Sequence, residues 1–354
     1  MYPLVCVNKQ HLLENVRAVT ALCAEKHIEV TGVTKVFGAD PEIARVYVEG
    51  GVKRLGDSRI ENLKQLQGVE AEKWLIRPPM LSEVEDLVAF ADASLNSELV
   101  TIQAISDAAL KKGTQHRIIL MVDLGDIREG FIDHDELLEV AAETEKMPGV
   151  HLYGIGVNLT CFSFVQSDEE KMETLARVAA AISERIGREL EVVSGGNSAT
   201  LDLMLRDGIP ARVNNLRLGE SLLFGKERAK YTYLPGTHRD VFTLQCEIVE
   251  VKEKPSMPWG EIGVDSYGNT PSFIDRGMRK KAICAIGKQD FDVETSTATD
   301  PGLIVLGASS DHLMVDVTDS EKDYQVGDLI EFQLGYFSTM RAFTSKYVTK
   351  QYIG

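Results

Sequence analysis

The chain has 354 residues, of which 44% are hydrophobic and 26% are charged, and this is the composition of a globular protein long enough for two domains. Its formal net charge of -16 argues against non-specific binding to nucleic acid and to an anionic membrane surface. No apolar run predicts a membrane span, and the start does not resemble a signal peptide. The five cysteines form no CxxC pair, so we expect reduced thiols, no metal site and a cytoplasmic protein.

Apolar strand patterns alternate with amphipathic helix patterns over the first two thirds of the chain. We expect strands at residues 28–35, 52–57, 73–77, 93–97, 117–125, 151–158, 191–196 and 214–219. We expect helices at residues 40–51, 81–91, 97–113, 134–147 and 168–187. This alternation predicts a (β/α)8 barrel. A doubly wound open sheet is the alternative, but its first strand usually ends in a glycine-rich turn.

The character of the sequence changes after about residue 230. From there on, apolar and polar residues alternate, turn residues interrupt the pattern, and no helical spacing is convincing. We therefore expect an α/β protein in which residues 1–230 form a (β/α)8 TIM-type barrel. Residues 231–354 are expected to form a smaller, all-β domain.

The first expected strand ends in a lysine, Lys35, within the stretch VTGVTKVFGAD. A buried ammonium is costly unless it is paired or deprotonated. One interpretation is that Lys35 extends its amine to solvent from the end of the strand. The other is that a desolvated lysine loses its proton more readily and attacks an aldehyde as a nucleophile. This stretch alone leaves both interpretations open.

The last two expected strands have the most informative carboxyl ends, which is where barrels place functional residues. In SGGNSAT, two glycines permit a tight turn, and Asn197 and Ser198 are placed to cap the next helix, either as an anion site or as an ordinary cap. In LRLGES, Arg217 ends the eighth strand beside Gly219, either in a binding site or in a salt bridge at the rim of the core. A lysine on strand one and an anion site after strand seven suggest a phosphorylated aldehyde, of which pyridoxal 5'-phosphate is the obvious example.

These motifs, in this order, resemble those of the alanine racemase superfamily of pyridoxal-phosphate enzymes, and within it the ornithine racemase branch. VTKVFG looks like the cofactor-lysine strand of that family, and DLGDIREG matches its DTGxGRxG segment in length. SGGNSATL and NNLRLGESLLFG resemble its phosphate and pyridine-arginine motifs. The resemblance covers nearly the whole chain and implies a barrel followed by a β domain, a pyridoxal 5'-phosphate cofactor and amino-acid racemisation.

The resemblance also implies a role for each matching residue. Lys35 would hold the cofactor covalently, Arg128 would reach its phenolic oxygen and the substrate, and Arg217 would face the pyridine nitrogen. Asp311, in GASSDHLMVDV, would lie at the substrate pocket. The remaining cofactor contacts would come from Asn158, Asn197, Ser198, Gly219, Glu220 and Tyr347.

The chain departs from the family pattern at two places. Alanine racemases have a histidine at the end of strand six, whereas this chain has Asn158, as the ornithine-type branch does. Their catalytic tyrosine lies in a GxVSYG stretch, whose nearest match here, GEIGVDSYGN, gives Tyr267, with Asp265 as the alternative base. Tyr267 could equally be a packing residue of the β domain. With Lys35 on one face of the cofactor and Tyr267 of a partner subunit on the other, we expect two-base proton transfer in a head-to-tail homodimer.

The resemblance favours a basic amino acid, such as ornithine, lysine or arginine, as the substrate, because Asp311 could receive a terminal ammonium. An alanine-specific or broad-specificity racemase remains the alternative, since alanine-type enzymes also carry an aspartate in this loop. A basic-amino-acid decarboxylase with the same cofactor would pair the pyridine nitrogen with a carboxylate, which Arg217 disfavours. A single-domain pyridoxal-phosphate-homeostasis protein would lack the β domain, and a non-catalytic cofactor-binding regulator would show no turnover.

Overall fold

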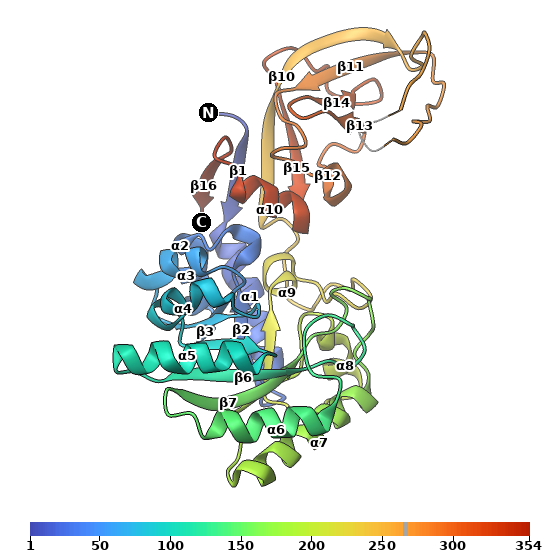
Figure 1. The fold of residues 1–354 in the computed structure, drawn as a ribbon. Helices are drawn as coiled ribbons and strands as arrows, with labels where there is room; N and C mark the ends of the chain where they lie inside the picture. Colours follow the sequence, from blue (N-terminus) through green and yellow to red (C-terminus); the bar gives the residue numbers. More distant parts are fainter. Residues whose placement is uncertain (265–267) are drawn as a thin grey trace. The chain divides into compact units, whose positions relative to one another are not determined.

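The computed structural model describes residues 1–264 and 268–354, which form two compact units (Figure 1). One unit is Lys9–Val241 and contains a closed barrel of parallel strands. The other unit is Met1–Asn8 together with Phe242–Gly354 and contains a mostly antiparallel sheet. The expected fold class, a (β/α)8 barrel with a smaller β-rich domain, is confirmed.

The barrel strands follow one another around the barrel in chain order. They are β2 (Glu29–Val33), β3 (Arg54–Asp57), β4 (Glu72–Leu75), β5 (Ala93–Asn96), β6 (His116–Val122), β7 (Val150–Val157), β8 (Val192–Ser194) and β9 (Asn215–Leu218). The barrel closes where β2 pairs in parallel with β9, so that Thr31 lies opposite Arg217. Because all eight strands are parallel, their carboxyl ends share one rim, and the loops that carry the expected site residues of the barrel follow these ends.

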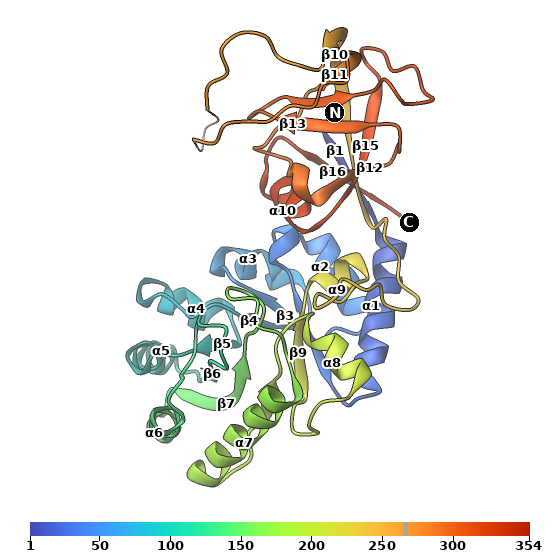
Figure 2. The ribbon, with the colours of Figure 1, turned by 90° about the vertical axis from the view of Figure 1, so that its right-hand side faces the viewer.

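Helices cover the outside of the barrel (Figure 2). They are α1 (Lys9–Ala24), α2 (Pro41–Glu49), α3 (Ile60–Gln65), α4 (Val84–Phe90), α5 (Leu99–Lys112), α6 (His134–Glu145), α7 (Glu169–Ile186), α8 (Thr200–Arg206) and α9 (Glu220–Phe224), with 3-10 turns η1 (Lys35–Phe37), η2 (Leu66–Gly68) and η3 (Leu81–Glu83). Local sequence sets their ends. The Asp40 carboxylate accepts from two amides at the start of α2, and Gly187 ends α7 in the left-handed region with a φ of 79°.

A cluster of buried apolar side chains packs along the middle strands of the barrel, from β4 to β8. Its members are Trp74, Ala93, Leu95, Ile119, Met121, Tyr153 and Val192. The ring of Trp74 packs edge-on against Tyr153 on β7, with centroids 6.2 Å apart. This packing fixes the strands and thereby the positions of the residues at their carboxyl ends.

The second unit is built on a sheet with the strand order β12-β15-β10-β11-β14-β13. Its elements are β1 (Leu4–Asn8), β10 (Phe242–Pro255), β11 (Met278–Cys284), η4 (Val293–Thr295), β12 (Ser296–Ala298), β13 (Ile304–Ala308), β14 (Leu313–Asp316), β15 (Leu329–Leu334), α10 (Tyr336–Thr344) and β16 (Thr349–Ile353). Helix α10 corrects the expectation of an all-β domain. It buries Ser338, Thr339 and Ala342, a helical spacing that small polar residues hid in the sequence.

The division of the chain differs from the expected boundary after residue 230. Residues 1–8 belong to the second unit, because β1 pairs antiparallel with β10 and parallel with β16. Residues 231–241 stay with the barrel, where the Thr237 hydroxyl donates to the Gly225 carbonyl and Asn15 bonds to the backbone of His238. Among the helices of the described chain, none combines the length and hydropathy that a membrane crossing requires.

Candidate active site

Lys35 lies just beyond the carboxyl end of β2, as the first residue of η1. The preceding residue, Thr34, is anchored because its hydroxyl donates a 2.6 Å hydrogen bond to Oδ2 of Asp57, at the end of β3. Burial raises the pKa of Asp57. The hydrogen bonds that its carboxylate accepts from Thr34 and Asn62 act in the opposite direction but do not cancel this rise. Lys35 is itself half-buried, and its amine has no hydrogen bond or ion pair with any described residue. An amine that reacts covalently must not be held in an ion pair. The amine of Lys35 meets this requirement among the described residues.

Arg217, on β9, is 3% exposed and is held from three sides. Its Nη1 donates a 2.5 Å hydrogen bond to the Ser194 hydroxyl on β8. Its Nη2 donates to the Val157 carbonyl at 2.7 Å and to Oδ1 of Asn158 at 2.6 Å. Burial lowers the pKa of Arg217 to about 10, and the Glu129 carboxylate opposes this effect. Arg217 is thus a fixed cation at neutral pH that forms no ion pair with a described carboxylate, which rules out the rim salt bridge considered from the sequence.

Glu129, which the sequence did not single out, joins the expected residues into one network. Its carboxylate accepts a 2.7 Å hydrogen bond from Nη2 of Arg128 and forms an ion pair with Nε of the same guanidinium. The same carboxylate accepts from Nδ2 of Asn158, whose Oδ1 accepts from Arg217. Arg128, Asn158 and Arg217 therefore form a continuous chain with Glu129. The only signal in the sequence was a carboxylate directly after the motif arginine, and charged neighbours of this kind are common on surfaces.

The loop after β6 is shaped by Asp123, at the end of that strand. Its carboxylate accepts hydrogen bonds from the amides of Gly125, Ile127 and Arg128 at 2.8 to 3.2 Å. Gly130 has a φ of 126°, and a Cβ there would lie only 2.6 Å from the Asp123 amide nitrogen. The loop thus requires glycine at this point and turns tightly, which brings the Arg128 side chain back to the rim.

The loops after β8 and β9 meet at two buried hydroxyls. The oxygens of Ser198 and Ser221 are 3.1 Å apart, and the Ser221 amide donates to the Ser198 oxygen at 3.2 Å. The expected caps are corrected, because α8 begins at Thr200 and its N-cap, Ala199, makes no side-chain bond. Asn197 instead accepts from the Ala199 amide and donates to the Leu159 carbonyl, because the chain makes a further turn before the helix.

Gly219 and Glu220 lie at the start of α9, next to the paired serines. A Cβ on Gly219 would approach the Cβ of Val33 on β2 to 3.2 Å, so the absence of a side chain permits this close approach. Glu220 is buried, and burial raises its pKa, opposed by Lys226 and Arg228 at 3.7 and 3.6 Å. The Glu220 side chain is therefore engaged by cations of its own loop, which leaves its backbone amide as the group offered to a ligand.

Two described residues that were expected at the site form no hydrogen bond with this network. Asp311 and Tyr347 belong to the second unit. The carboxylate of Asp311 accepts from Gln289 at 2.8 Å and from Ser310 at 2.9 Å, and Tyr347 is 60% exposed. Tyr267 and the alternative base Asp265 lie outside the described residues.

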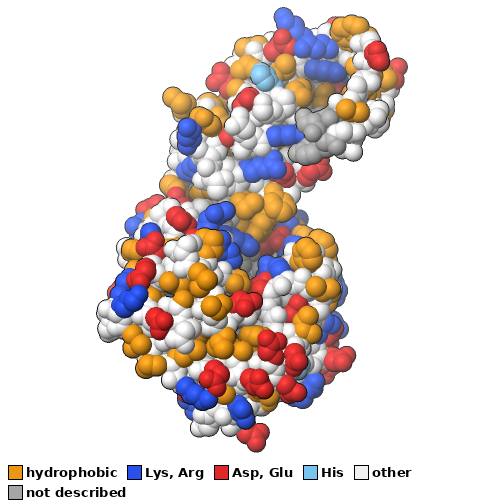
Figure 3. All heavy atoms as spheres, in the orientation of Figure 1, with side chains coloured by type: hydrophobic (Ala, Val, Ile, Leu, Met, Phe, Trp, Pro, Cys, Tyr) orange, Lys and Arg blue, Asp and Glu red, His pale blue; other side chains and the backbone are white. Residues whose placement is uncertain are grey.

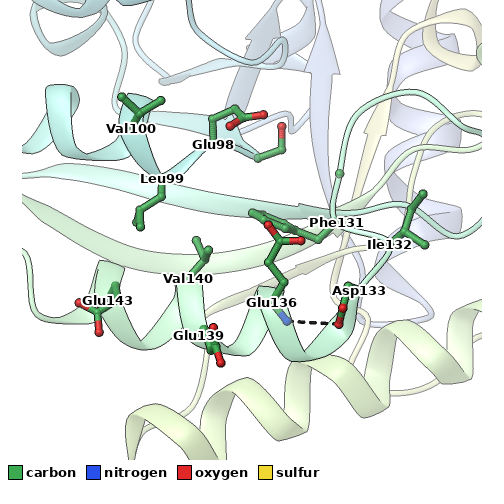
Figure 4. A pocket seen from close by; sticks show the side chains of 12 residues that line it. Glu98, Leu99, Val100, Phe131, Ile132, Asp133, Glu136, Glu139, Val140 and Glu143 are labelled. Carbon is green, nitrogen blue, oxygen red and sulfur yellow. Dashed lines mark hydrogen bonds between the residues drawn. The ribbon is translucent and has the colours of Figure 1, made fainter.

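A hollow of about 950 Å³ lies between the starts of α5 and α6 (Figure 4). Its charged lining consists of Glu98, Asp133, Glu136, Glu139 and Glu143. Neither lysine nor arginine lines it, and neither does any expected site residue, so it lacks the groups that the chemistry above needs.

His11, His238 and Asp240 bring three potential metal-ligand atoms within 4.8 Å of one another. The two imidazole rings are stacked, with centroids 4.0 Å apart and planes only 8° from parallel. A metal ion binds in the plane of an imidazole ring, so parallel stacked rings cannot both bind one ion. In addition, each ring already contacts a carboxylate, His11 that of Asp240 and His238 that of Glu14.

With this geometry in view, comparison with known proteins identifies the family. Residues 7–227 match the model described as alanine racemase, N-terminal domain. The chain belongs to the alanine racemase family. The resemblance inferred from its motifs is confirmed.

Characterised and structurally solved relatives cover nearly the whole chain. Ornithine racemase of Acetoanaerobium sticklandii is 43% identical over 351 residues, or 99% of both chains. Lysine racemase of Thermotoga maritima is 35% identical over 354 residues, again 99% of both chains. A crystal structure of alanine racemase from Bartonella henselae with covalently bound pyridoxal phosphate has a TM-score of 0.72 at 18% identity, covering 99% of both chains. This last likeness shows the fold.

Proposed function

We propose that this chain is a pyridoxal-phosphate-dependent racemase of a basic amino acid, with ornithine as the first candidate substrate. The observation that carries the proposal is the amine of Lys35, which has no described partner at the carboxyl end of β2. The neighbouring strand, β9, carries the buried Arg217. The similarity to an ornithine racemase and a lysine racemase along the whole chain supports both the reaction and the class of substrate.

The donors at the rim fit pyridoxal phosphate, which needs a primary amine, a phosphate site and a partner for its pyridine nitrogen. Lys35 supplies the amine, and the hydroxyls of Ser198 and Ser221 supply donors for the phosphate. Asn197 and the backbone amides of Gly219 and Glu220 lie in the same two loops. Arg217 donates three hydrogen bonds within the described chain. Because a guanidinium has five N–H groups, donors remain for the pyridine nitrogen.

When bound, the cofactor supplies the electron sink that makes the α-hydrogen of an amino acid acidic. The amine of Lys35 moves the α-proton on one face of the substrate, and Tyr267 of the partner subunit moves it on the opposite face. Arg217 keeps its own proton at neutral pH, because even its lowered pKa is about 10. It therefore donates a hydrogen bond without protonating the ring, which disfavours transamination. Arg128 donates hydrogen bonds to the phenolic oxygen of the cofactor and to the substrate carboxylate. Tyr347 donates a hydrogen bond to the phosphate.

Two exposed apolar surfaces support a head-to-tail homodimer. One lies on the loops and helix starts that follow β4 to β7, and the other on the long connection between β10 and β11. The side chains concerned are at least 39% exposed: Met80, Leu81, Val100, Ile127, Ile132, Phe162 and Phe164 on the barrel, and Met257, Trp259, Ile262, Val264, Phe273 and Ile274 on the connection. Exposed hydrophobic side chains are visible on both units (Figure 3), and such surfaces commonly mark protein interfaces.

Asp311 is the proposed partner of the terminal ammonium of the substrate. Its carboxylate accepts only two hydrogen bonds within the described chain, from Gln289 and Ser310. An ionised carboxylate can accept about four, so it has capacity for an ammonium group. We also propose a cytoplasmic location, because all five cysteines are free thiols.

The proposal is tested by incubating the purified protein and pyridoxal phosphate with each L-amino acid and separating the products by chiral chromatography. We expect conversion of L-ornithine to a racemic mixture, with lysine or arginine next and alanine slower. Carbon dioxide measured in the same incubations would reveal a decarboxylase instead. Absence of any turnover across the panel would favour a non-catalytic cofactor-binding protein.

A second experiment locates the covalent link. Borohydride reduction of the protein with its cofactor should label the peptide that contains Lys35. A label on another lysine would refute the role of Lys35, whatever the substrate.

A further inference from the structure

Glu129 lies on the loop after β6, and its side chain is only 12% exposed. An ionised carboxylate in such a position needs partners, because burying an unpaired charge is costly. Glu129 has two. Its carboxylate accepts a hydrogen bond from Nη2 of Arg128, forms an ion pair with Nε of the same guanidinium, and accepts a hydrogen bond from the side-chain amide of Asn158.

The contact with Asn158 determines which way its side-chain amide is oriented. With Nδ2 directed at the carboxylate, Oδ1 is directed at Nη2 of Arg217, 2.6 Å away. The reversed amide would place its oxygen against the Glu129 carboxylate and its NH2 group against the guanidinium of Arg217. Both contacts would then be repulsive, so the negative charge of Glu129 selects the orientation that binds Arg217.

Glu129 also acts on Arg217 directly through its charge. Arg217 is 3% exposed and forms no ion pair with a described carboxylate, yet the charge of Glu129 favours its protonated form. Arg128 receives both a counter-ion and a fixed orientation from the same carboxylate. One side chain therefore controls two cations that lie on different strands or loops of the barrel.

We infer that Glu129 is a positioning residue that couples Arg128 to Arg217 through the amide of Asn158. This inference rests on the proposed function, in which Arg128 contacts the phenolic oxygen of the cofactor and Arg217 its pyridine nitrogen. Glu129 aligns these two arginines with each other. Glu129 acts through Arg128 and Asn158, the groups that its carboxylate holds.

The variant Glu129→Gln keeps the shape of the side chain and removes its charge. A lost hydrogen bond to a charged group weakens binding by about 10- to 100-fold. We therefore expect the dissociation constant for pyridoxal phosphate, measured by absorbance titration of the apoprotein, to rise by about that factor. In the racemase assay, kcat should fall more than KM changes, and Glu129→Asp should restore part of both losses.

The matched control is Glu145→Gln. Glu145 is also a partly buried carboxylate paired with one arginine, and it accepts hydrogen bonds from Arg188 at 2.8 and 2.7 Å. It contacts none of the residues of the candidate site, so its variant should bind the cofactor as the unaltered protein does. Equal effects of the two variants would mean that Glu129 is a structural ion pair and would overturn the inference.

A double-mutant cycle tests the route through Asn158. If Glu129 acts through this amide, Glu129→Gln and Asn158→Ala combined should raise the dissociation constant by much less than the product of the single effects. Additive effects would contradict the coupling. A protein that binds cofactor but racemises nothing would refute the proposed function while leaving this cycle informative. Crystal structures of the apoprotein give a readout that needs no cofactor: in Glu129→Gln, the Arg128 side chain should leave its present orientation, and an unchanged orientation would refute the inference.

Discussion

The hydroxyls of Ser198 and Ser221 lie 3.1 Å apart, although the two residues follow different strands of the barrel. Both side chains are buried, and the oxygen of Ser198 also accepts from the Ser221 amide. Two hydroxyls in contact at the rim are arranged to turn together towards one acceptor, such as a phosphate oxygen.

We predict that Ser198→Ala weakens the binding of pyridoxal phosphate by about 10-fold, the usual cost of a hydrogen bond to a charged group. Binding of pyridoxal, which lacks the phosphate, should hardly change. Titration of the apoprotein with both compounds measures the difference. Ser183→Ala, which alters a buried hydroxyl on α7 that bonds to the Leu190 amide, is the control and should affect neither compound. Equal weakening of both compounds by Ser198→Ala would contradict a phosphate role.

Arg217→Glu should change the outcome of the reaction as well as its rate. A carboxylate at this position would accept a hydrogen bond from a protonated pyridine nitrogen and stabilise that protonated form, which strengthens the electron sink and promotes transamination. We expect racemisation to fall about 100-fold and the yield of pyridoxamine phosphate per turnover to rise, as measured by absorbance and chromatography. Arg217→Lys retains a cation and should show a smaller rise. If Arg217→Glu binds the cofactor and shows neither change, Arg217 does not contact the ring nitrogen.

Mixed dimers test whether the second base comes from a partner subunit. Lys35→Ala and Tyr267→Phe should each be nearly inactive alone, since loss of an acid–base group costs about 100-fold or more. After subunit exchange, activity should return to about a quarter of the unaltered level, because half of the randomly mixed dimers are hybrids with one of two sites intact. No recovery after verified exchange would place both bases in one chain, or would assign the second base to Asp265.

Barrel stability should decrease in mild acid because of His116. This side chain is 2% exposed, and burial, assisted by the charge of Arg117, lowers its pKa to about 3. Unfolding exposes an imidazole with a pKa of about 6.5, so the unfolded chain binds one more proton between these two values. The contribution of His116 to the free energy of unfolding is therefore fully present above pH 6.5. It decreases by about 1.4 kcal/mol per pH unit as the pH falls towards 3.

Urea unfolding at pH 7 and pH 5 measures this contribution. Trp74 is fully buried in the barrel, whereas Trp259 is 84% exposed, so a Trp259→Phe background makes fluorescence report on the barrel alone. The side chain of the His116→Gln variant cannot titrate. The slope of the unfolding free energy against pH should therefore decrease by the equivalent of about one bound proton. An unchanged slope would show that the folded chain protonates His116 in this range.

The barrel and the residues at its rim were predictable because their signals are local. Strand and helix patterns recur along the chain, and parallel strands bring their carboxyl ends to one rim, so Lys35, Arg128 and Arg217 could be placed together. Glu129 could not be recognised, because its partner Asn158 is 29 residues away and no pattern announces that pairing. Ser221 was missed for the same reason, since its partner lies in another loop.

The expected domain boundaries placed residues 1–8 with the barrel, and they differ from the structure for another physical reason. A strand pattern shows that a segment is extended, but not which strand it pairs with. Leu4 pairs with Gln245 and with Thr349, so the partners of β1 lie in the last third of the chain. Helix α10 was missed because its buried face carries Ser338 and Thr339, which do not register as an apolar stripe.

The place of β1 between β10 and β16 has a consequence for synthesis on the ribosome. The segment Leu4–Asn8 is translated before the barrel, yet neither of its hydrogen-bonding neighbours exists until after the whole barrel has been made. The barrel, Lys9–Val241, is continuous in the chain and can fold while the rest is still being translated. Until β10 is released, Leu4–Asn8 has no strand to pair with, and its second edge stays open until β16 follows. An open strand edge of this kind is what chaperones bind and what aggregates when translation stalls.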